Sequence, residues 1–476
     1  MKKIKLGVVP TRRNVFSRED ALKFKKLILE KLAEYEEVEV FDIDWLNSEG
    51  LLYDSEDDTD LVIRYMREKE VDAMFFPHCN FGTEHTVART AQEIGKPVLL
   101  WGPRDEDPLE DGFRLRDTQC GLFATGKILR RFRVPFTYVP NTVIGSEVFE
   151  RGFKNFFAAV NVIKSFRKMR LLQISTRPAD FWTMMYNEGE LLERFNIKIN
   201  PVSLIDLEIR FNSILNSNSD ILKAEAEDIK KKVDCSRSSE EDVLRIASLK
   251  ISLKQLAEET KSSAIAIQCW HSLQKSLKIM PCLVNSLLTD EMIPVTCETD
   301  IHGAITAVMA QEAAFATTPI FFADLTVRHS QNDNGELLFH CGNFPVSLAA
   351  EGEKPELRQH FLFDSKCVGT VEHKIKGGDM TVLRFDGDNG QYKLLMGKAR
   401  GIEGAYTRGT YVWIEVDNWL KWERKLVEGP YVHHSVGIHA DVIPVLYEAS
   451  KYIPGLELDL VDMTEEDILD YLEARK

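Results

Sequence analysis

The feature that most constrains the fold is an alternation of short apolar runs with helical patterns across the first ~165 residues. The helical patterns follow Ser17 and cover residues 85–94. The apolar runs that resemble buried strands are residues 4–9, 38–43, 71–76 and 97–101. Strands that alternate with helices in this way favour βαβ units, so this part of the chain predicts a mostly parallel sheet.

The same alternation restarts near Arg167 and changes character near residue 350. There, residues 381–385 and 392–396 flank Asp386-Gly387-Asp388-Asn389-Gly390, which is a strong β-hairpin signal. We therefore expect an α/β protein with two Rossmann-like α/β domains followed by a β-rich C-terminal domain. The expected domains are residues 1–166, residues 167–345, which carry the metal-site residues, and residues 346–476, which end in helices.

Composition excludes several classes of function. The chain has 60 Lys and Arg against 75 Asp and Glu, a formal charge of −15, so neither nucleic acid nor an anionic membrane is an expected partner. Its eight cysteines are scattered without a C-x-x-C pair, as in a reducing compartment. The apolar segment after the basic start is too short for a signal sequence, and no window suits a membrane span. These features predict a cytoplasmic protein.

Three apolar runs end on side chains that can bind a metal, namely Glu298, Asp324 and His340. A fourth candidate is the pair His433-His434, which we expect in a loop. Ligand sites in open α/β sheets form beyond the carboxyl ends of strands, so these side chains could converge. Carboxylates with imidazole suit Mn²⁺ or a related divalent ion. Each residue also has a structural alternative, because a strand-end Asp often caps a helix and a buried His often only donates hydrogen bonds.

The sequence around these residues indicates a particular protein family more specifically than their spacing does. The segments that carry a family resemblance are Val295-Thr296-Cys297-Glu298-Thr299-Asp300-Ile301-His302-Gly303-Ala304, Phe321-Phe322-Ala323-Asp324-Leu325-Thr326, Phe339-His340-Cys341-Gly342-Asn343 and His433-His434. In their order and separations the chain resembles the L-fucose/L-arabinose isomerase family. The resemblance implies an aldose–ketose isomerase of carbohydrate metabolism, with a barrel-like C-terminal domain and assembly into a homo-oligomer, a trimer or hexamer.

The resemblance also assigns roles to single residues. Glu298 and Asp324 match metal-binding carboxylates that double as the proton-transfer pair, and His434 matches the late metal-binding histidine. His340 matches a ligand of arabinose isomerases that is less central in fucose isomerases. Asp324 is a departure from the arabinose enzymes, which have Glu there, and the chain is shorter than a typical fucose isomerase. The substrate is therefore expected to be a monosaccharide, a pentose, hexose or deoxy sugar, without a single sugar being indicated.

The chemistry explains why such groups are needed. Moving a carbonyl from C1 to C2 requires a proton to leave C2 and another to reach C1, through a cis-enediol with developing negative charge. A divalent cofactor, with Mn²⁺ expected, would stabilise that charge, and two carboxyl groups would act as general base and general acid. Which of Glu298 and Asp324 begins the reaction depends on the handedness of the sugar.

Four residues are candidates for sugar binding. Gln268 and Trp270 follow a strand-like run at residues 264–267, Asn343 lies just beyond His340, and Arg13 follows the first strand. The alternatives are a plain strand-to-helix loop for the first two, a turn for Asn343 and a solvated cation for Arg13. A polar strand-end loop at residues 77–84 occupies the family position of a substrate-lining loop.

Two other classes of function stay open at this point. One is a non-catalytic cytoplasmic sugar-binding protein, because tandem α/β units also suit hinged binding proteins. The other is a metal-dependent aldolase or hydrolase with the same oxygen and nitrogen ligands. A Rossmann dehydrogenase is disfavoured, because Val8-Val9-Pro10-Thr11-Arg12-Arg13 stands where a G-x-G-x-x-G motif would be.

Overall fold

The chain folds into two compact units in the computed structural model, which describes residues 3–362 and 367–475. The first unit consists of Met1–Lys164, Pro444–Pro454 and Glu465–Lys476. The second consists of Ser165–Ile443 and Gly455–Thr464. Three domains divided after residues 166 and 345 remain a prediction.

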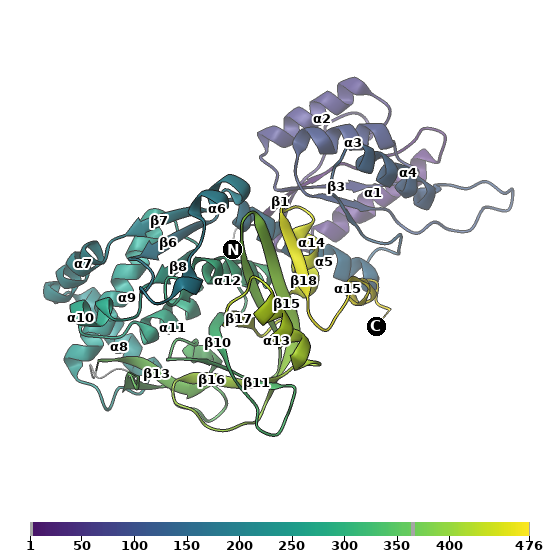
Figure 1. The fold of residues 1–476 in the computed structure, drawn as a ribbon. Helices are drawn as coiled ribbons and strands as arrows, with labels where there is room; N and C mark the ends of the chain where they lie inside the picture. Colours follow the sequence, from purple (N-terminus) through teal and green to yellow (C-terminus); the bar gives the residue numbers. More distant parts are fainter. Residues whose placement is uncertain (1–2, 363–366, 476) are drawn as a thin grey trace. The chain divides into compact units, whose positions relative to one another are not determined.

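The first unit is built on a parallel sheet with the strand order β2-β1-β3-β4-β5 (Figure 1). Its strands are β1 Ile4–Val8, β2 Val38–Phe41, β3 Ala73–Pro77, β4 Val98–Trp101 and β5 Thr137–Tyr138. Its helices are α1 Arg18–Leu32, α2 Glu56–Glu68, α3 Glu84–Ile94, α4 Thr118–Arg131, most of α5 Glu147–Arg167 and of α14 Ile443–Ser450, and α15 Glu465–Leu472. Strands β3 and β4 are continuous apolar runs and are buried throughout, as strands covered on both faces must be.

Local signals set the helix boundaries in this unit. Ser17 begins α1 as its N-cap, with its hydroxyl accepting the N–H of Asp20. Helix α3 packs against both α2 and α4, and the ring of Tyr35, just after α1, lies 5.2 Å from that of Phe157 in α5. The βαβ organisation expected from the sequence is confirmed here.

The second unit begins with a four-stranded parallel sheet in the order β7-β6-β8-β9. Its strands are β6 Arg170–Ile174, β7 Lys198–Val202, β8 Ala264–Ile267 and β9 Val295–Thr296. The helices of this part are α6 Glu188–Phe195, α7 Leu204–Ser217, α8 Asp220–Lys232, α9 Glu240–Thr260, α10 Ser272–Leu277, α11 Cys282–Asp290 and α12 Ile301–Ala313. Two short 3₁₀ turns, Trp182–Met184 and Val346–Leu348, also belong to this unit.

The rest of the second unit is a nine-stranded sheet in the order β12-β13-β16-β11-β10-β17-β14-β15-β18. Its elements are β10 Ile320–Arg328, β11 Gly335–His340, β12 Glu356–Gln359, β13 Val368–Lys374, β14 Asp379–Asp388, β15 Gln391–Ile402, β16 Thr410–Glu415, helix α13 Trp419–Glu428, β17 His434–Ile438 and β18 Leu456–Leu460. Strand β16 pairs with both β11 and β15, so six antiparallel strands close into a ring. The β-rich character predicted for the C-terminal part is confirmed.

The predicted hairpin joins β14 to β15 and is longer than expected. Its turn is Asn389-Gly390, with φ of 48° and 77°. Positive φ at both positions is typical of a type I′ turn, which Asn-Gly favours.

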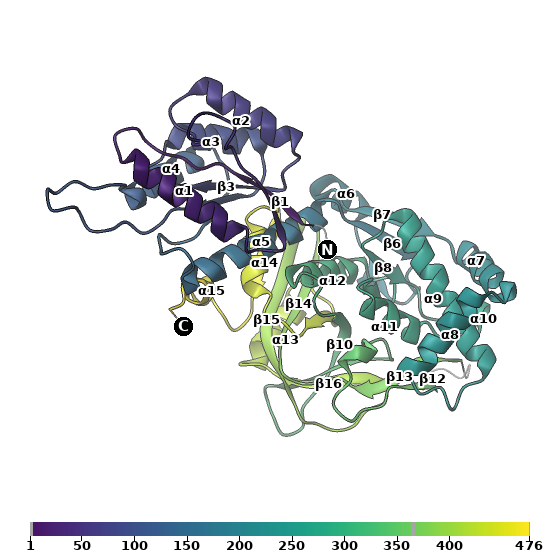
Figure 2. The same ribbon diagram turned by 180° about the vertical axis from the view of Figure 1, so that it is seen from behind.

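Helix α12 positions the candidate site because it lies between the two sheets of the second unit. It contacts β6, β8 and β9 of the parallel sheet and β10, β14 and β17 of the larger sheet (Figures 1 and 2). Its sequence is apolar almost all round, and nearly every residue is buried, as expected for a helix covered on all sides. No described helix has the length and apolar character needed to cross a membrane.

Candidate active site

Glu298 lies in the turn that leads from β9 into α12. Both Glu298 and Thr299 have left-handed backbone conformations, with φ of 54° and 60°. Such values are uncommon outside glycine, and most of all for a β-branched residue. The turn is held by two hydrogen bonds, from the N–H of Thr299 to the carbonyl of Ile267 (3.1 Å) and from the N–H of Asp300 to the carbonyl of Cys297 (3.0 Å). Backbone strain of this kind clusters at functional sites.

Asp324 and His434 face each other on neighbouring antiparallel strands, β10 and β17. Residues in direct register point to the same face of a sheet, and His434 Nε2 lies 3.3 Å from Asp324 Oδ1. Two local expectations were therefore wrong. Asp324 lies within a nine-residue strand rather than at a strand end, and His434 opens a strand rather than lying in a loop. Antiparallel pairing, not a shared carboxyl edge, brings these two residues together.

The four side chains that the sequence singled out as metal ligands converge. Glu298 Oε2 lies 3.7 Å from both His340 Nε2 and His434 Nε2. Glu298 Oε2, Asp324 Oδ1 and His340 Nε2 are buried atoms without a hydrogen-bond partner among the described residues. Unpartnered buried polar atoms are rare in folded proteins. Oxygen and nitrogen atoms gathered in this way fit a divalent cation.

The two histidines differ in the atom that they leave available. His434 Nδ1 lies 2.9 Å from Asp300 Oδ2, so it carries the hydrogen and donates, and the lone pair of Nε2 faces Glu298 and Asp324. His340 Nδ1 instead accepts the backbone N–H of Cys341 (2.9 Å), which leaves the hydrogen of a neutral ring on Nε2. The geometry favours His434 as an ion ligand, while the Nε2 hydrogen of His340 faces Glu298 Oε2 at 3.7 Å, beyond hydrogen-bond distance.

A buried charge network holds His434 in place. Arg384 donates to both Asp300 oxygens, one of them at 3.2 Å, and to Asp386 Oδ2 at 2.7 and 2.8 Å. Asp386 Oδ1 also meets His302 Nδ1 at 2.8 Å. Burial raises the pKa of Asp300, but the charge of Arg384 and the hydrogen bond with His434 outweigh burial and lower it. Asp300 is therefore an ionised partner for the His434 ring.

The electrostatics of the cluster keep Glu298 charged. Burial alone would raise its pKa, but the neighbouring imidazole of His340 and, after it, the charge of His434 lower it. For His434, burial lowers the pKa, and the hydrogen bond with Asp300 and the charge of Asp324 raise it above the ordinary value. The Asp324 side chain is 22 % exposed while Glu298 and His434 are buried, so solvent reaches the cluster from the Asp324 side.

The residues proposed for sugar binding have different surroundings from one another. Gln268 directly follows β8 and is buried, next to Ile267, whose carbonyl accepts the Thr299 N–H. Asn343 donates from Nδ2 to Cys297 Sγ at 3.4 Å, one residue from Glu298. Trp270 packs edge-on against Phe181, with ring centroids 5.3 Å apart.

Arg13 belongs to the first unit. There its guanidinium pairs with Glu84 and lies 4.1 Å from the centroid of the Phe81 ring, so it contacts the polar loop at residues 77–84.

Several residues of the site were missed by the sequence reasoning, namely Asp300, His302, Arg384, Asp386 and Cys269. Asp300 and His302 lie within the quoted segment after Glu298 and gave no separate signal. Arg384 could have been found, because an arginine inside an apolar strand must be paired with carboxylates when it is buried.

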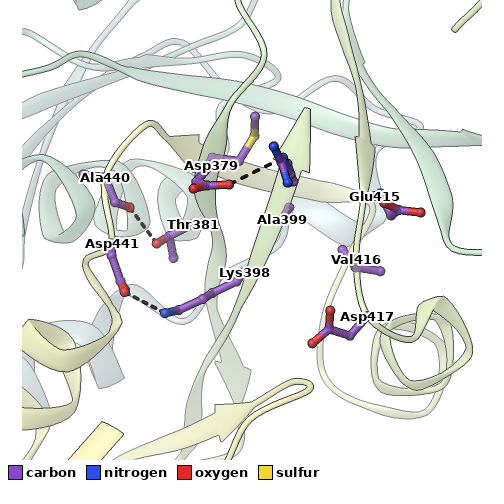
Figure 3. A pocket seen from close by; sticks show the side chains of 11 residues that line it. Asp379, Thr381, Lys398, Ala399, Glu415, Val416, Asp417, Ala440 and Asp441 are labelled. Carbon is purple, nitrogen blue, oxygen red and sulfur yellow. Dashed lines mark hydrogen bonds and ion pairs between the residues drawn. The ribbon is translucent and has the colours of Figure 1, made fainter. Parts of the chain in front are cut away.

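A separate cavity of about 250 Å³ opens beside β14, β15 and β16 (Figure 3). Figure 3 shows Lys398 meeting Asp441 and the Thr381 hydroxyl donating to the Ala440 carbonyl, at 2.7 Å in both cases. Its walls include neither histidine nor any of the residues described above. Because both cations of its lining are paired with carboxylates, Lys398 with Asp441 and Arg400 with Asp379, we assign the chemistry to the Glu298 cluster instead.

Comparison with known proteins gives likenesses to sugar isomerases. Residues 7–167 match the model of the fucose/sulfoquinovose isomerase N-terminal domain. A sulfoquinovose isomerase of Alkalicoccus urumqiensis is 25% identical over 416 residues, 86% of this chain and 90% of that protein. Sulfoquinovose isomerases of Priestia aryabhattai and Priestia megaterium are each 23% identical over 393 residues, 82% of this chain and 85% of theirs.

A structural match is much weaker. A periplasmic solute-binding protein of Actinobacillus succinogenes with bound D-allose aligns over 57% of this chain and 80% of its own, with 13% identity and a TM-score of 0.17. Agreement at that level carries no argument about fold or activity. The domain match and the sulfoquinovose isomerases agree with the resemblance seen in the sequence, and the chain belongs to the fucose isomerase-like family, as an enzyme of the aldose–ketose isomerase class.

Proposed function

We propose that this enzyme is a divalent-metal-dependent isomerase that moves a sugar carbonyl between C1 and C2 through a cis-enediol. The observation that carries the proposal is the convergence of Glu298, Asp324 and His434. Their free oxygen and nitrogen atoms face one another at 3.3 and 3.7 Å, and two of these oxygens have no hydrogen-bond partner in the described chain.

Glu298, Asp324 and His434 would hold the ion, for which we expect Mn²⁺. A bound divalent ion would supply positive charge to the two sugar oxygens that become negative in the enediol. His434 presents Nε2 because its Nδ1–H donates a hydrogen bond to Asp300, and the imidazole of His340 would help to hold the Glu298 carboxylate by electrostatic attraction.

Glu298 and Asp324 are the proposed proton-transfer pair. Glu298 is buried and its pKa is lowered, so it is ionised at neutral pH and suited to accept a proton. Asp324 lies on the exposed side of the cluster, where a sugar would enter. The two carboxyl groups come from different elements, which allows them to approach the C1–C2 bond from different directions.

Sulfoquinovose is the first substrate to test, because it is named for the relatives that align over most of this chain. Gln268 and Asn343 are the proposed hydrogen-bonding groups for sugar hydroxyls, and Trp270 is the proposed aromatic wall. Arg13 is the fourth residue proposed for sugar binding. A homo-oligomer, a trimer or hexamer, remains the proposed assembly.

The test is a panel of sulfoquinovose, L-fucose and L-arabinose, assayed for ketose formation with Mn²⁺ and with a chelator. We expect conversion of at least one sugar with Mn²⁺, loss of activity on chelation, and deuterium from solvent at C1 or C2 without bond cleavage. Full activity in metal-stripped enzyme would refute metal dependence. Tight sugar binding without conversion would favour the non-catalytic alternative, and carbon–carbon cleavage would favour the aldolase.

A further inference from the structure

The two oxygens of the Glu298 carboxylate face different sets of side chains. Oε2 faces the imidazoles of His340 and His434. Oε1 accepts a hydrogen bond from the thiol of Cys269, with Oε1 and Sγ 3.2 Å apart. One carboxylate therefore separates a nitrogen-rich side from a sulfur-rich side.

The sulfur-rich side contains a second thiol, that of Cys297. The sulfurs of Cys269 and Cys297 and a carboxylate oxygen of Glu298 all lie within 4.8 Å of one another, and all three residues are buried. Two thiolates with a carboxylate are a ligand set for zinc and similar ions, whereas Mn²⁺ prefers oxygen and nitrogen. The two sides of Glu298 therefore differ in the ions that they select.

The surroundings of Cys297 suit a sulfur that carries negative charge. Asn285 and Asn343 both direct their side-chain amide N–H groups at its Sγ, each at 3.4 Å. A neutral thiol is a weak hydrogen-bond acceptor, so two amide donors on one buried sulfur are better matched to a metal-bound thiolate. The donors come from α11 and from the loop after β11, and thus fix the sulfur from two elements.

We propose that Cys269, Cys297 and Glu298 form a second cation site, which takes thiophilic divalent ions such as Zn²⁺ and Cd²⁺. Binding releases the two thiol protons to solvent and involves no change of oxidation state. The inference does not rest on the proposed isomerisation, because it requires only these three side chains.

A consequence follows from the shared carboxylate. A thiophilic ion at this site engages Glu298 and withdraws it from the His434 side. We therefore expect Zn²⁺ to inhibit an enzyme that is active with Mn²⁺, and to inhibit it less when either cysteine is replaced.

The direct test is a Cd²⁺ titration of metal-stripped protein, followed by the ultraviolet charge-transfer absorption of cadmium–thiolate bonds. Cys120 is exposed, and Cys235 and Cys367 are partly exposed, so the titration uses a Cys120→Ser/Cys235→Ser/Cys367→Ser background. We expect a saturable band at one Cd²⁺ per chain. The band should be lost in Cys269→Ser and in Cys297→Ser. Cys282→Ser, which changes another buried cysteine nearby, is the matched control and should keep the band.

The result that overturns the proposal is an absent band, or a band that persists in Cys269→Ser or Cys297→Ser, or one that is lost equally in Cys282→Ser. Circular dichroism and thermal unfolding establish that each variant is folded. If both serine variants unfold, ¹¹³Cd NMR of the background protein decides, because its shift distinguishes two sulfur ligands from a site of oxygen and nitrogen only. These measurements involve no sugar, so their failure is separate from failure of the proposed function.

Discussion

At the scale of single residues, the candidate site is defined by the atom that each side chain leaves free. His434 and His340 are both buried beside Glu298, yet their ring nitrogens are engaged differently. Asp300 accepts a hydrogen bond from Nδ1–H of His434, whereas the Cys341 amide donates a hydrogen bond to Nδ1 of His340. Residue type and burial alone do not distinguish the roles of these two histidines, whereas their hydrogen-bond partners do.

Replacing either proposed proton-transfer carboxylate tests their roles. We expect Glu298→Gln and Asp324→Asn to lower kcat by on the order of 10²-fold or more, because each loses a general acid or base. Both should also lose bound metal, measured by elemental analysis. Glu336→Gln, which changes another buried carboxyl group on β11, is the control and should keep both properties. Full turnover by Glu298→Gln or Asp324→Asn would end the assignment.

Glu336 itself predicts a pH dependence of stability. Burial raises its pKa from 4.5 to about 7, so between these pH values the folded protein holds a proton that the unfolded chain releases. The free energy of unfolding therefore falls as the pH rises through this window. Glu336→Gln removes the free-energy cost of ionising this buried carboxyl group. The variant should therefore be more stable than wild type at pH 8, by on the order of 3 kcal/mol.

Urea unfolding of both proteins at pH 4.5 and pH 8 measures this difference. The advantage of Glu336→Gln should shrink to a small fraction at the lower pH, where the carboxyl group is protonated in the folded protein and already half protonated in the unfolded chain. An advantage that does not change with pH would mean that packing, not ionisation, separates the two proteins.

At the scale of elements, the charge network joins three segments around His434. Asp300 begins α12 as its N-cap, Arg384 lies in β14 and His434 begins β17. The single carboxylate of Asp300 caps a helix, pairs with a buried cation and orients a histidine ring. The position of the ring is therefore coupled to the packing of α12 between the two sheets.

Two isosteric substitutions separate stability from metal binding in this network. Asp300→Asn and Asp386→Asn each leave Arg384 with one fewer charged partner and should destabilise the fold by about 3–5 kcal/mol, as broken buried pairs do. Of Asp300 and Asp386, only Asp300 contacts His434. Only Asp300→Asn should therefore also weaken Mn²⁺ binding, by roughly 10- to 100-fold. Calorimetric titration with Mn²⁺ measures this, and equal losses of affinity in both variants would contradict the positioning role.

The sequence predicted elements better than it predicted their pairing. The alternating strands and helices and the Asn389-Gly390 hairpin depend on neighbours within a few residues, and the structure has them. The strand positions of Asp324 and His434 were wrong, because their register depends on two segments that are distant in sequence. A run of apolar residues does not show whether its pairing is parallel or antiparallel.

At the scale of the whole molecule, the proposed ligands come from the β9–α12 turn, β10 and β17 of the second unit. An ion held by all three would bind the folded protein and not the unfolded chain. Ligand binding of this kind stabilises a fold by mass action.

Mn²⁺ should therefore raise the thermal stability of metal-stripped protein, by about 2.7 kcal/mol at 100 times its Kd. Thermal unfolding with Mn²⁺ and with a chelator measures this, and His434→Gln should not respond. Because the pKa of His434 is raised, its ring stays protonated to a higher pH than an ordinary histidine, and protons compete with the ion. The stabilisation should thus shrink as pH falls, and a response that does not change between pH 5 and pH 8 would exclude His434 as a ligand.

The sequence by itself determined the alternation of strands and helices and the β-rich C-terminal part. Through short segments that resemble a family, it also determined which residues to propose for the site, namely Glu298, Asp324 and His434. These follow from local patterns, which each segment carries without reference to the rest of the chain. Only the tertiary structure decided that Asp324 and His434 are cross-strand neighbours, that Arg384 supports the site through Asp300, and that Glu298 faces two thiols on its other side. Such contacts arise from register and close packing between segments far apart in sequence. No local pattern encodes which distant side chain will pair with a buried charged group.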